Sequence, residues 1–496
     1  MAHTFRLLRA GGDSTIRSAD LLRESSPAVT FSTDKEITVA GNYYSVLIGN
    51  NGSGKSRLLG QIASEFALRY RHPGLRSEKT AKLAVLDYLV DGSPVERNAT
   101  AGTSRRSIGG PASALALPTR VIAVALTPVD KFPLEVSGTS DEVAERELAD
   151  PDEDNAFYHY VGMRDRTNRA SISALLYRAV EGLGLRRTTT DTARLRAVFE
   201  MLDYRPEILV RLRISISEDV QTFFQSERAL NELRQDDSRL LKRLRTAWET
   251  GSYSDDWLRT KLGVIASSAE KGGVEFALSF EGGGQSAAFD IEALRLLRRL
   301  GALTLSAVIV CRTDGTRHDL RQASSGEISI LTVFLSIASR LRDGSLVLID
   351  EPETSLHPEW QSKYIHLVRE VFSGFSGCHF IFSTHSPHIV ADVPAGSCIY
   401  SMDRASTVSS DELLGRSPDY VMARAFDVVG PTNYYLRDVL AEALRLVGER
   451  EIGSAAFKTQ LAELVRLSDH MEDGDQVKRI VEDLQSAQAE LAPHAD

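Results

Sequence analysis

Up to about residue 140, the hydrophobic residues fall into short runs separated by glycine, proline, serine and aspartate. Such runs between turn-forming residues are typical of β-strands. Residues 5–8, 28–31 and 37–39 predict the short strands of an antiparallel edge that leads into the first long apolar strand. Residues 82–88 predict a further strand. Residues 120–126, RVIAVAL, are apolar almost throughout, which indicates a strand buried on both faces of a parallel sheet.

The hydrophobic pattern changes to helical spacing from about residue 141. Between residues 218 and 248, apolar positions recur every three or four residues with charges elsewhere, which predicts an amphipathic helix. The heptad series lapses at Glu227 and Asp237, which favours an ordinary core-facing helix over a coiled coil. We therefore predict that residues 141–267 form a helical insertion.

Downstream of the insertion the pattern returns to strands. The predicted strands cover residues 274–280, 286–291, 303–311, 346–349 and 379–383, the first two as a hairpin. Beyond about residue 403 the spacing is helical to the end of the chain. These changes predict an α/β fold in which a mixed sheet with flanking helices is interrupted by the insertion and followed by a helical region. The predicted parts are residues 1–140, 141–267, 268–402 and 403–496.

Residues 43–63, YYSVLIGNNGSGKSRLLGQIA, combine a buried strand, a glycine-rich loop and a helix. The spacing from Gly49 to Gly54, Lys55 and Ser56 fits the P-loop pattern. Its glycines let backbone N–H groups close around phosphate oxygens, Lys55 can reach the β- and γ-phosphates, and Ser56 can bind Mg²⁺. The predicted nucleotide-binding residues of this loop are Asn50, Asn51, Gly52, Ser53, Gly54, Lys55, Ser56 and Arg57.

Two later strands end in residues that suit phosphate chemistry. Asp350 ends the apolar run 346–349 and is placed to hold Mg²⁺, while Glu351 can orient or deprotonate an attacking water. His385 follows the run 379–383 and is placed to sense a γ-phosphate. Alone, the acidic pair is a weak signal and the histidine is more often a core residue. Together with the P-loop, they predict that Lys55, Glu351 and His385 act in catalysis and that Ser56 and Asp350 bind the metal.

Composition argues against several classes of protein. The chain has 496 residues, with 58 Lys and Arg against 68 Asp and Glu, a formal net charge of -10. This is not the balance of a dedicated basic nucleic-acid binder. Cys311, Cys378 and Cys398 have no CxxC spacing, which argues against a disulfide framework and a zinc site. The N-terminus lacks the apolar core of a signal peptide, and residues 303–311 are too few to span a bilayer. We therefore expect a cytoplasmic protein without membrane contact.

Four motifs follow one another along the chain: GNNGSGKS at 49–56, ASSGE at 323–327, LVLIDEPETSLHP at 346–358 and FSTHSP at 382–387. This order resembles that of the ABC-type ATPases, in the branch of AAA-family ATP-binding proteins that contains the SMC, RecF-like and OLD-family members, rather than that of membrane transporters. The resemblance covers residues 40–62 and 270–390. It implies an ABC-type ATPase head that binds ATP and Mg²⁺.

The same resemblance implies roles for further residues. The signature motif, which in the family contacts the γ-phosphate held by the opposite subunit, would consist of Ser324, Ser325, Gly326 and Glu327. From the residues themselves, Ser324 or Ser325 is expected to cap a helix with Glu327 in its first turn. The D-loop would consist of Ser355, Leu356 and His357, and His385 would be the switch histidine. The family's Q-loop glutamine is not evident after residues 120–126, where Thr127 and Asp130 stand instead.

A narrower resemblance rests on TPVDKFP at 127–133, AFYHYVGMRDRTNRAS at 156–171 and LLGRSPDYVMARAF at 413–426. These segments look like ATPase subunits of Septu-type and retron-associated anti-phage systems. That resemblance implies a head-to-tail dimer, or a higher oligomer, that controls a separate nuclease of the HNH type. We expect such an effector to dock on residues 141–267 or on the region after 403. Contact with nucleic acid, directly or through the partner, stays open. The alternative is a DNA-repair or recombination ATPase that binds DNA itself.

Overall fold

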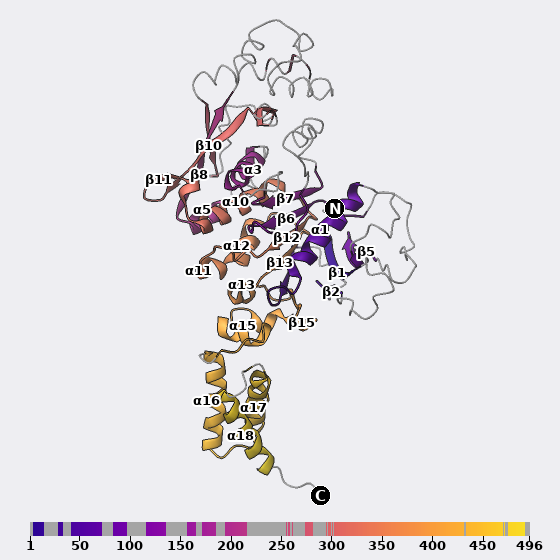
Figure 1. The fold of residues 1–496 in the computed structure, drawn as a ribbon, viewed down its shortest axis with the longest axis vertical. Helices are drawn as coiled ribbons and strands as arrows, with labels where there is room; N and C mark the ends of the chain where they lie inside the picture. The colour runs from indigo at the N-terminus through magenta and orange to yellow at the C-terminus, as the bar shows by residue number, and fades with distance from the viewer. Residues whose placement is uncertain are drawn as a thin grey trace.

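The structure is a computed structural model of the whole chain. It describes residues 3–13, 28–32, 41–71, 83–96, 116–134, 156–164, 171–184, 194–215, 254, 256–257, 260, 273–280, 294, 296–298, 300, 302–430, 433–469, 471 and 475–491. The predicted helix at 218–248 and the predicted strands at 37–39 and 286–291 lie outside the described residues. The described residues form three sheets and a helical C-terminal region (Figure 1).

A seven-stranded sheet forms the centre of the molecule. In spatial order its strands are β15 (Ser406–Ser409), β14 (Cys398–Ser401), β3 (Tyr43–Ile48), β13 (His379–Ser383), β12 (Leu346–Asp350), β6 (Val121–Ala125) and β7 (Tyr158–Gly162). All neighbours pair in parallel except β14 and β15. The residues of β6, β7, β12 and β13 are buried throughout, as expected for a parallel sheet covered on both faces. The carboxyl ends of β3, β12, β13 and β6 therefore share one edge.

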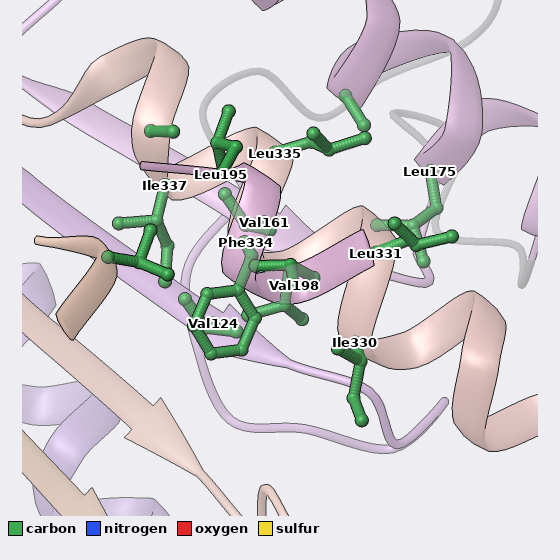
Figure 2. Close-up of a cluster of buried hydrophobic side chains, with 14 of the residues drawn as sticks. Val124, Val161, Leu175, Leu195, Val198, Ile330, Leu331, Phe334, Leu335 and Ile337 are labelled. Atoms are coloured by element: carbon green, nitrogen blue, oxygen red, sulfur yellow. The ribbon is translucent and has the colours of Figure 1, made fainter. Parts of the chain in front are cut away.

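Successive residues of the central strands face opposite layers. In β12, Val347 and Ile349 join the core under α10, whereas Leu346 and Leu348 join the core under α1. The first layer contains α3 (Ile172–Gly184), α5 (Arg196–Met201), α10 (Ser325–Arg340) and α12 (Tyr364–Val371). Figure 2 shows Leu331 and Phe334 of α10 packed with Val198 of α5 and Val161 of β7. Each such side chain stabilises the fold by roughly 1.5–3 kcal/mol when it is fully buried.

The second layer contains α1 (Lys55–Arg71) and a four-stranded antiparallel sheet. The order of that sheet is β2 (Val29–Thr30), β1 (Phe5–Asp13), β4 (Leu83–Val90) and β5 (Ser93–Val95). The predicted strands at 5–8, 28–31 and 82–88 are thus confirmed, but they form a sheet of their own instead of an edge of the P-loop sheet. Phe5, Phe66 and Tyr88 join this sheet to α1 through ring contacts of 5.3–5.6 Å between centroids.

A third sheet corrects the prediction for residues 141–267. Its order is β11 (Arg317–Asp319), β10 (Leu303–Arg312), β8 (Tyr204–Ile214) and β9 (Val274–Ser279). The expectation of helix is wrong for β8, and also for β7, which joins the central sheet. In β8 the buried residues alternate with exposed or partly exposed ones. That period of two is typical of a strand with one covered face, and the helical spacing farther along the insertion obscured it. β9 pairs with β8, and β10 lies outside the central sheet.

The C-terminal region is helical, as predicted, apart from β15. It contains α14 (Ser410–Leu413), α15 (Pro418–Ala425), α16 (Tyr434–Gly448), α17 (Ala455–Ser468) and α18 (Gln476–Leu491). Leu436, Phe457 and Leu464 belong to a separate small core that includes Ala423 of α15. The side chains of Asn433 and Ser454 cap α16 and α17. In Figure 1, α16–α18 lie at the opposite end of the molecule from β8 and β10.

The α/β fold class with a large mixed sheet is therefore confirmed. The remaining short helices are η4 (Leu320–Gln322) between β11 and α10, α11 (Pro358–Gln361) between β12 and α12, and α13 (Pro387–Ala391) between β13 and β14. In the part of the chain that the structure describes, no helix has both the length and the apolar character that crossing a membrane requires.

Candidate functional site

The P-loop connects the end of β3 to the start of α1. Gly52 and Gly54 have φ angles of 84° and 97°, which side chains rarely adopt, so the two glycines let the chain turn tightly into the helix. The helix begins at Lys55, and the N–H of Leu58 donates to the carbonyl of Gly54 at 2.9 Å. The first backbone N–H groups of α1 therefore lack helical partners and point toward the loop, where they suit an anion.

The side chain of Lys55 lies inside this loop and is 4% exposed. Its Nζ donates to the carbonyl oxygens of Gly49 (2.8 Å) and Asn50 (3.1 Å) and to Oγ of Ser53 (3.3 Å). Among the described residues, no carboxylate forms an ion pair with Lys55. Burial lowers the pKa of Lys55, and the nearby carboxylates, Glu351 first, oppose that shift. A buried ammonium group without a charged partner is stabilised by an arriving phosphate.

The carboxylate of Asp350 reaches the P-loop from the end of β12. It accepts hydrogen bonds from the hydroxyls of Ser383, at the end of β13, and Ser56, at the start of α1. Burial raises the pKa of Asp350, and these two hydrogen bonds oppose the shift. A hydroxyl and a carboxylate that meet in this way offer the oxygen ligands that Mg²⁺ prefers. The residues therefore fit the predicted metal site.

Glu351 and His385 lie beside this pair. The backbone of Glu351 is in the left-handed region (φ 48°), and its N–H donates to the carbonyl of Ser383 at 3.0 Å. Its Oε1 is 3.9 Å from Nε2 of His385, and both side chains are about one-third exposed. Burial and then the charge of Lys55 lower the pKa of His385, while Glu351 opposes them. His385 is therefore neutral near pH 7, with one ring nitrogen able to donate and the other to accept.

Glu353 is a site residue that the motif analysis missed. Its Oε1 accepts the backbone N–H of His385 at 2.6 Å, and it also bonds the side chain of Thr384. Its Oε2 is buried and has no hydrogen-bond partner within the described part of the chain. Burial raises the pKa of this carboxyl group, with Glu351 adding to the shift. Glu353 thus holds the loop that carries His385, and its position two residues after Glu351 is the only signal in the sequence.

The four signature residues begin α10. Ser324 is the cap: its Oγ accepts the N–H of Glu327 at 3.2 Å, and its own N–H donates to Oε2 of Glu327 at 2.8 Å. This capping box confirms the sequence expectation and selects Ser324 over Ser325. Glu327 also accepts from the hydroxyl of Tyr204 (2.9 Å) and from Nη2 of Arg312 (2.8 Å). Ser324 and Ser325 stay exposed, whereas Glu327 is committed to contacts within its own chain.

Gly326 lies directly against the predicted D-loop. A Cβ atom at this position would be 2.8 Å from the carbonyl oxygen of Ser355 and 2.8 Å from the ring of Trp360. The D-loop backbone turns at Ser355 through a left-handed conformation (φ 67°), followed by Leu356 and His357, the cap of α11. The structure therefore brings the signature and D-loop segments together. Within the described part of the chain, no hydrogen bond or ion pair joins residues 324–327 to the P-loop.

Asp130 lies in the segment after β6, where the resemblance would place a Q-loop glutamine. It follows β6 and is buried, and it accepts hydrogen bonds from the hydroxyl of Tyr160 (2.6 Å) and from Nε of Arg164 (2.8 Å). Its negative charge contributes to the raised pKa of Asp350. Tyr160 and Arg164 come from β7 and its end, so only the pairing of β7 with β6 brings them to Asp130. The ends of β6 and β7 thus supply a carboxylate–arginine pair close to Asp350.

Comparisons with known proteins place the chain in a family of AAA domains. A family model described as "AAA domain, putative AbiEii toxin, Type IV TA system" matches residues 68–391, more than half of the chain, and begins after the P-loop. Among curated relatives, "Protein ea59" of Escherichia phage lambda is 32% identical over 92 residues, 18% of this chain and 17% of that protein. "Retron Ec83 probable ATPase" of Escherichia coli is 38% identical over 79 residues, 14% of each chain. "Septu protein PtuA" of Bacillus thuringiensis is 44% identical over 45 residues, 9% of this chain and 11% of that protein.

The matched segments span less than a fifth of the length of these curated relatives. Among solved structures, the chain is similar to an Smc head domain with an extended coiled coil bound to the C-terminal domain of ScpA, derived from Pyrococcus furiosus. The identity is 11% and the TM-score 0.28, over 83% of this chain and 97% of that one. The SMC head domain from Thermotoga maritima has the same identity and coverage, with a TM-score of 0.27. Scores below 0.5 carry no weight for the site.

Proposed function

Because the chain belongs to the family described as "AAA domain, putative AbiEii toxin, Type IV TA system", we propose that it binds ATP in the P-loop and hydrolyses it. It is an ATPase of the AAA type, related to the retron Ec83 and Septu proteins. The observation that carries the proposal is the meeting of Lys55, Ser56 and Asp350, with Glu351 and His385, at one edge of the central sheet. Parallel α/β sheets bind ligands at such an edge.

Each residue has a distinct proposed role. Lys55 binds the β- and γ-phosphates together with the N–H groups of the loop, and residues 50–57 enclose the phosphate chain. Ser56 and Asp350 would hold Mg²⁺, which supplies positive charge next to the phosphate oxygens. Glu351 takes a proton from the attacking water. The neutral imidazole of His385 orients that water or donates to a γ-phosphate oxygen, in the position that Glu353 holds for it.

We further propose that two copies pair head to tail. In the family that this chain resembles, the signature motif acts on the nucleotide of the opposite subunit. Ser324 and Ser325 are exposed, and within the described part of the chain no hydrogen bond or ion pair joins them to their own P-loop, which supports the same arrangement here. A symmetric pair would complete two equivalent sites. Residues 268–402 would supply the signature and Asp350, and residues 1–140 the P-loop.

The proposed role of the dimer is to regulate a separate effector in anti-phage defence, in the cytoplasm. The names of the curated relatives, a retron ATPase and a Septu protein, support this setting. The effector would be a nuclease of the HNH type, docked on the insertion at 141–267 or on the helices after residue 403. We propose the same four parts of the chain as before, residues 1–140, 141–267, 268–402 and 403–496. Within the second part, β7 belongs to the central sheet.

The first prediction tests binding and hydrolysis separately. Lys55→Ala removes the charge that holds the phosphates, so ATP binding is lost. Glu351→Gln keeps the binding residues and removes the base, so the variant binds ATP while hydrolysis falls by at least about a hundredfold. Calorimetry gives the affinity and phosphate release gives the turnover. Lys458→Ala, in an exposed part of α17, is the matched control and behaves as the wild type. Equal ATP affinity in Lys55→Ala and Glu351→Gln contradicts the assigned roles.

A further inference from the structure

The turn between β14 and β15 touches the first residues of the P-loop. The N–H of Asn50 donates to Oδ2 of Asp403 at 2.8 Å, and the N–H of Met402 donates to the carbonyl of Ile48 at 2.9 Å. A Cβ atom at Gly49 would be 3.1 Å from Cβ of Met402 and 3.4 Å from Oδ1 of Asp403. The turn therefore fits closely against the point where β3 enters the loop.

Asp403 also brings negative charge to the site. Its carboxylate raises the pKa of Lys55 and the pKa of His385, in each case against the larger lowering by burial. It therefore lies close enough to act on both groups, although no motif in the sequence includes it. By repulsion alone, a carboxylate near a triphosphate site weakens the binding of the anion. We therefore look for the role of Asp403 in the hydrogen bond by which it positions the P-loop.

The neighbouring residue, Arg404, faces the C-terminal helices. Its Nε and Nη2 donate to the two carboxylate oxygens of Asp427, a paired geometry that restricts the orientation of both side chains. Asp427 follows α15 and has a left-handed backbone (φ 57°). The two side chains are 28% and 23% exposed, so solvent screens this ion pair only in part.

α17 holds Asp427 and the end of α15 from the other side. Nη1 of Arg466 lies 3.7 Å from Asp427, and both of its Nη groups donate to the carbonyl of Ala423 at 3.3 Å. Glu463 fixes Arg466 (2.8 Å) and also pairs with Arg424 of α15 (3.1 Å). The last carbonyls of a helix lack partners within it, and cationic side chains satisfy them. A continuous series of contacts therefore runs from α17 to the P-loop.

We propose that Asp403 is a positioning residue of the ATP site, held in place from the C-terminal helices through Arg404, Asp427 and Arg466. Asp403 fixes the start of the P-loop, so the affinity for ATP depends on the contact between α15 and α17. By thermodynamic linkage, ATP in turn stabilises that contact. An effector that moves α17 would then change ATP affinity without reaching the nucleotide. The inference rests on the proposed binding of ATP.

The test measures ATP affinity, with Mg²⁺, by calorimetry on full-length variants. Asp403→Ala removes a hydrogen bond to the P-loop and weakens ATP binding about fivefold. Asp403→Asn keeps an acceptor oxygen for the N–H of Asn50, and its ATP affinity stays near that of the wild type.

Asp427→Asn tests the contact with the C-terminal helices. It keeps the left-handed backbone, which asparagine tolerates, but removes the charge that holds Arg404, so it also weakens ATP binding. Combined with Asp403→Ala, it adds no further loss. Glu442→Gln, which breaks an exposed ion pair with Arg445 in α16, is the control.

Electrostatics alone gives the opposite result, which makes the test decisive. Asp403→Ala and Asp427→Asn each remove a negative charge, so repulsion alone predicts tighter ATP binding in both variants. Tighter or unchanged binding in Asp427→Asn overturns the inference, as do losses that add in the double variant. If Asp403→Asn binds as weakly as Asp403→Ala, the positional role is wrong. A wild-type chain that does not bind ATP overturns the proposed function, and this inference with it.

Discussion

His379, the first residue of β13, is a fully buried histidine whose ring nitrogens have separate partners. Nδ1 accepts the N–H of Leu7 at 3.0 Å, and Nε2 lies 2.8 Å from Oγ of Ser45. Because Ser45 donates its own proton to the carbonyl of Phe31, Nε2 must carry the histidine's proton. The ring is therefore neutral, and burial with the nearby charge of Arg6 lowers the pKa of His379 to about 3.

Because His379 is buried and neutral, we predict that the folded protein loses stability in acid. The unfolded chain takes up a proton at His379 near pH 6.5, whereas the folded chain does so only near pH 3. The stability that depends on the neutral ring is complete above pH 6.5 and falls by about 1.4 kcal/mol for each pH unit below it, until about pH 3. Urea unfolding of the wild type and of His379→Gln between pH 7.5 and 5 measures the effect. We expect a steeper loss in the wild type. Parallel curves contradict the assignment.

At the scale of elements, the start of α10 depends both on residues that are close in the sequence and on residues that are distant in it. The capping box between Ser324 and Glu327 is local, and its residues lie three positions apart. The neighbours of Gly326 are distant: Ser355 and Trp360 come from the segment after β12. The helical backbone at position 326 would accept other residues. The residue must be small because Ser355 and Trp360 pack against it.

Gly326→Ala is predicted to impair hydrolysis while ATP binding is retained. The added methyl group would lie 2.8 Å from the Ser355 carbonyl oxygen and from the Trp360 ring, closer than van der Waals contact, so the D-loop shifts and the signature is displaced from the partner's nucleotide. We expect turnover to fall at least about tenfold, because small displacements of positioned groups cost large factors in rate. The matched control is Gly448→Ala in α16, where a Cβ atom meets nothing within 4 Å. Equal turnover in both alanine variants excludes this contact as a determinant of hydrolysis.

At the scale of the whole molecule, the P-loop and the signature form two separate groups. Ser56 of the P-loop and Asp350 of β12 share a hydrogen bond, while residues 324–327 contact the D-loop segment and Tyr204 of β8. A second copy is the proposed means of joining them. The helical region at the far end of Figure 1 meets the central sheet through α15 and the β14–β15 turn.

We predict that Glu351→Gln forms a dimer when ATP is present, because bound ATP that is not hydrolysed keeps both signatures engaged. Lys55→Ala, which does not bind ATP, stays monomeric under the same conditions. Native mass spectrometry with and without ATP gives the mass of each variant. A monomeric Glu351→Gln in the presence of saturating ATP is incompatible with the proposed pairing.

The last prediction is that the purified chain does not cleave nucleic acid by itself. The two carboxylates at the end of β12, Asp350 and Glu351, are assigned to the ATP site and cannot also serve the metal pair that cleaves a phosphodiester. Incubation with ATP, Mg²⁺ or Mn²⁺, and single- or double-stranded DNA should leave the DNA intact. Cleavage that persists in Lys55→Ala would show an independent nuclease. Tight binding of intact DNA would favour the alternative of a repair or recombination ATPase.

Much of this protein can be predicted from residues that are close together in the sequence. The P-loop, the cap of α10 and the helices after residue 403 depend on spacings of a few residues, and local hydrogen bonds or helical periodicity determine them. The apolar strands that end at Asp350 and Ser383 are equally visible, because burial on both faces demands unbroken apolar runs. For these elements the local pattern and the final structure agree.

The remaining features were decided by tertiary structure alone. β7 and β8 lie where helix was predicted, and only their pairing with β6 and β10 places them in the central and third sheets. Asp130 meets Arg164, and Asn50 meets Asp403, only because the order of strands in the sheet brings them to one edge. Asn50 and Asp403 are 353 residues apart, so no local spacing relates them. The sequence alone therefore predicted which residues would bind phosphate, and the packing of the sheet determined which distant residues lie beside them.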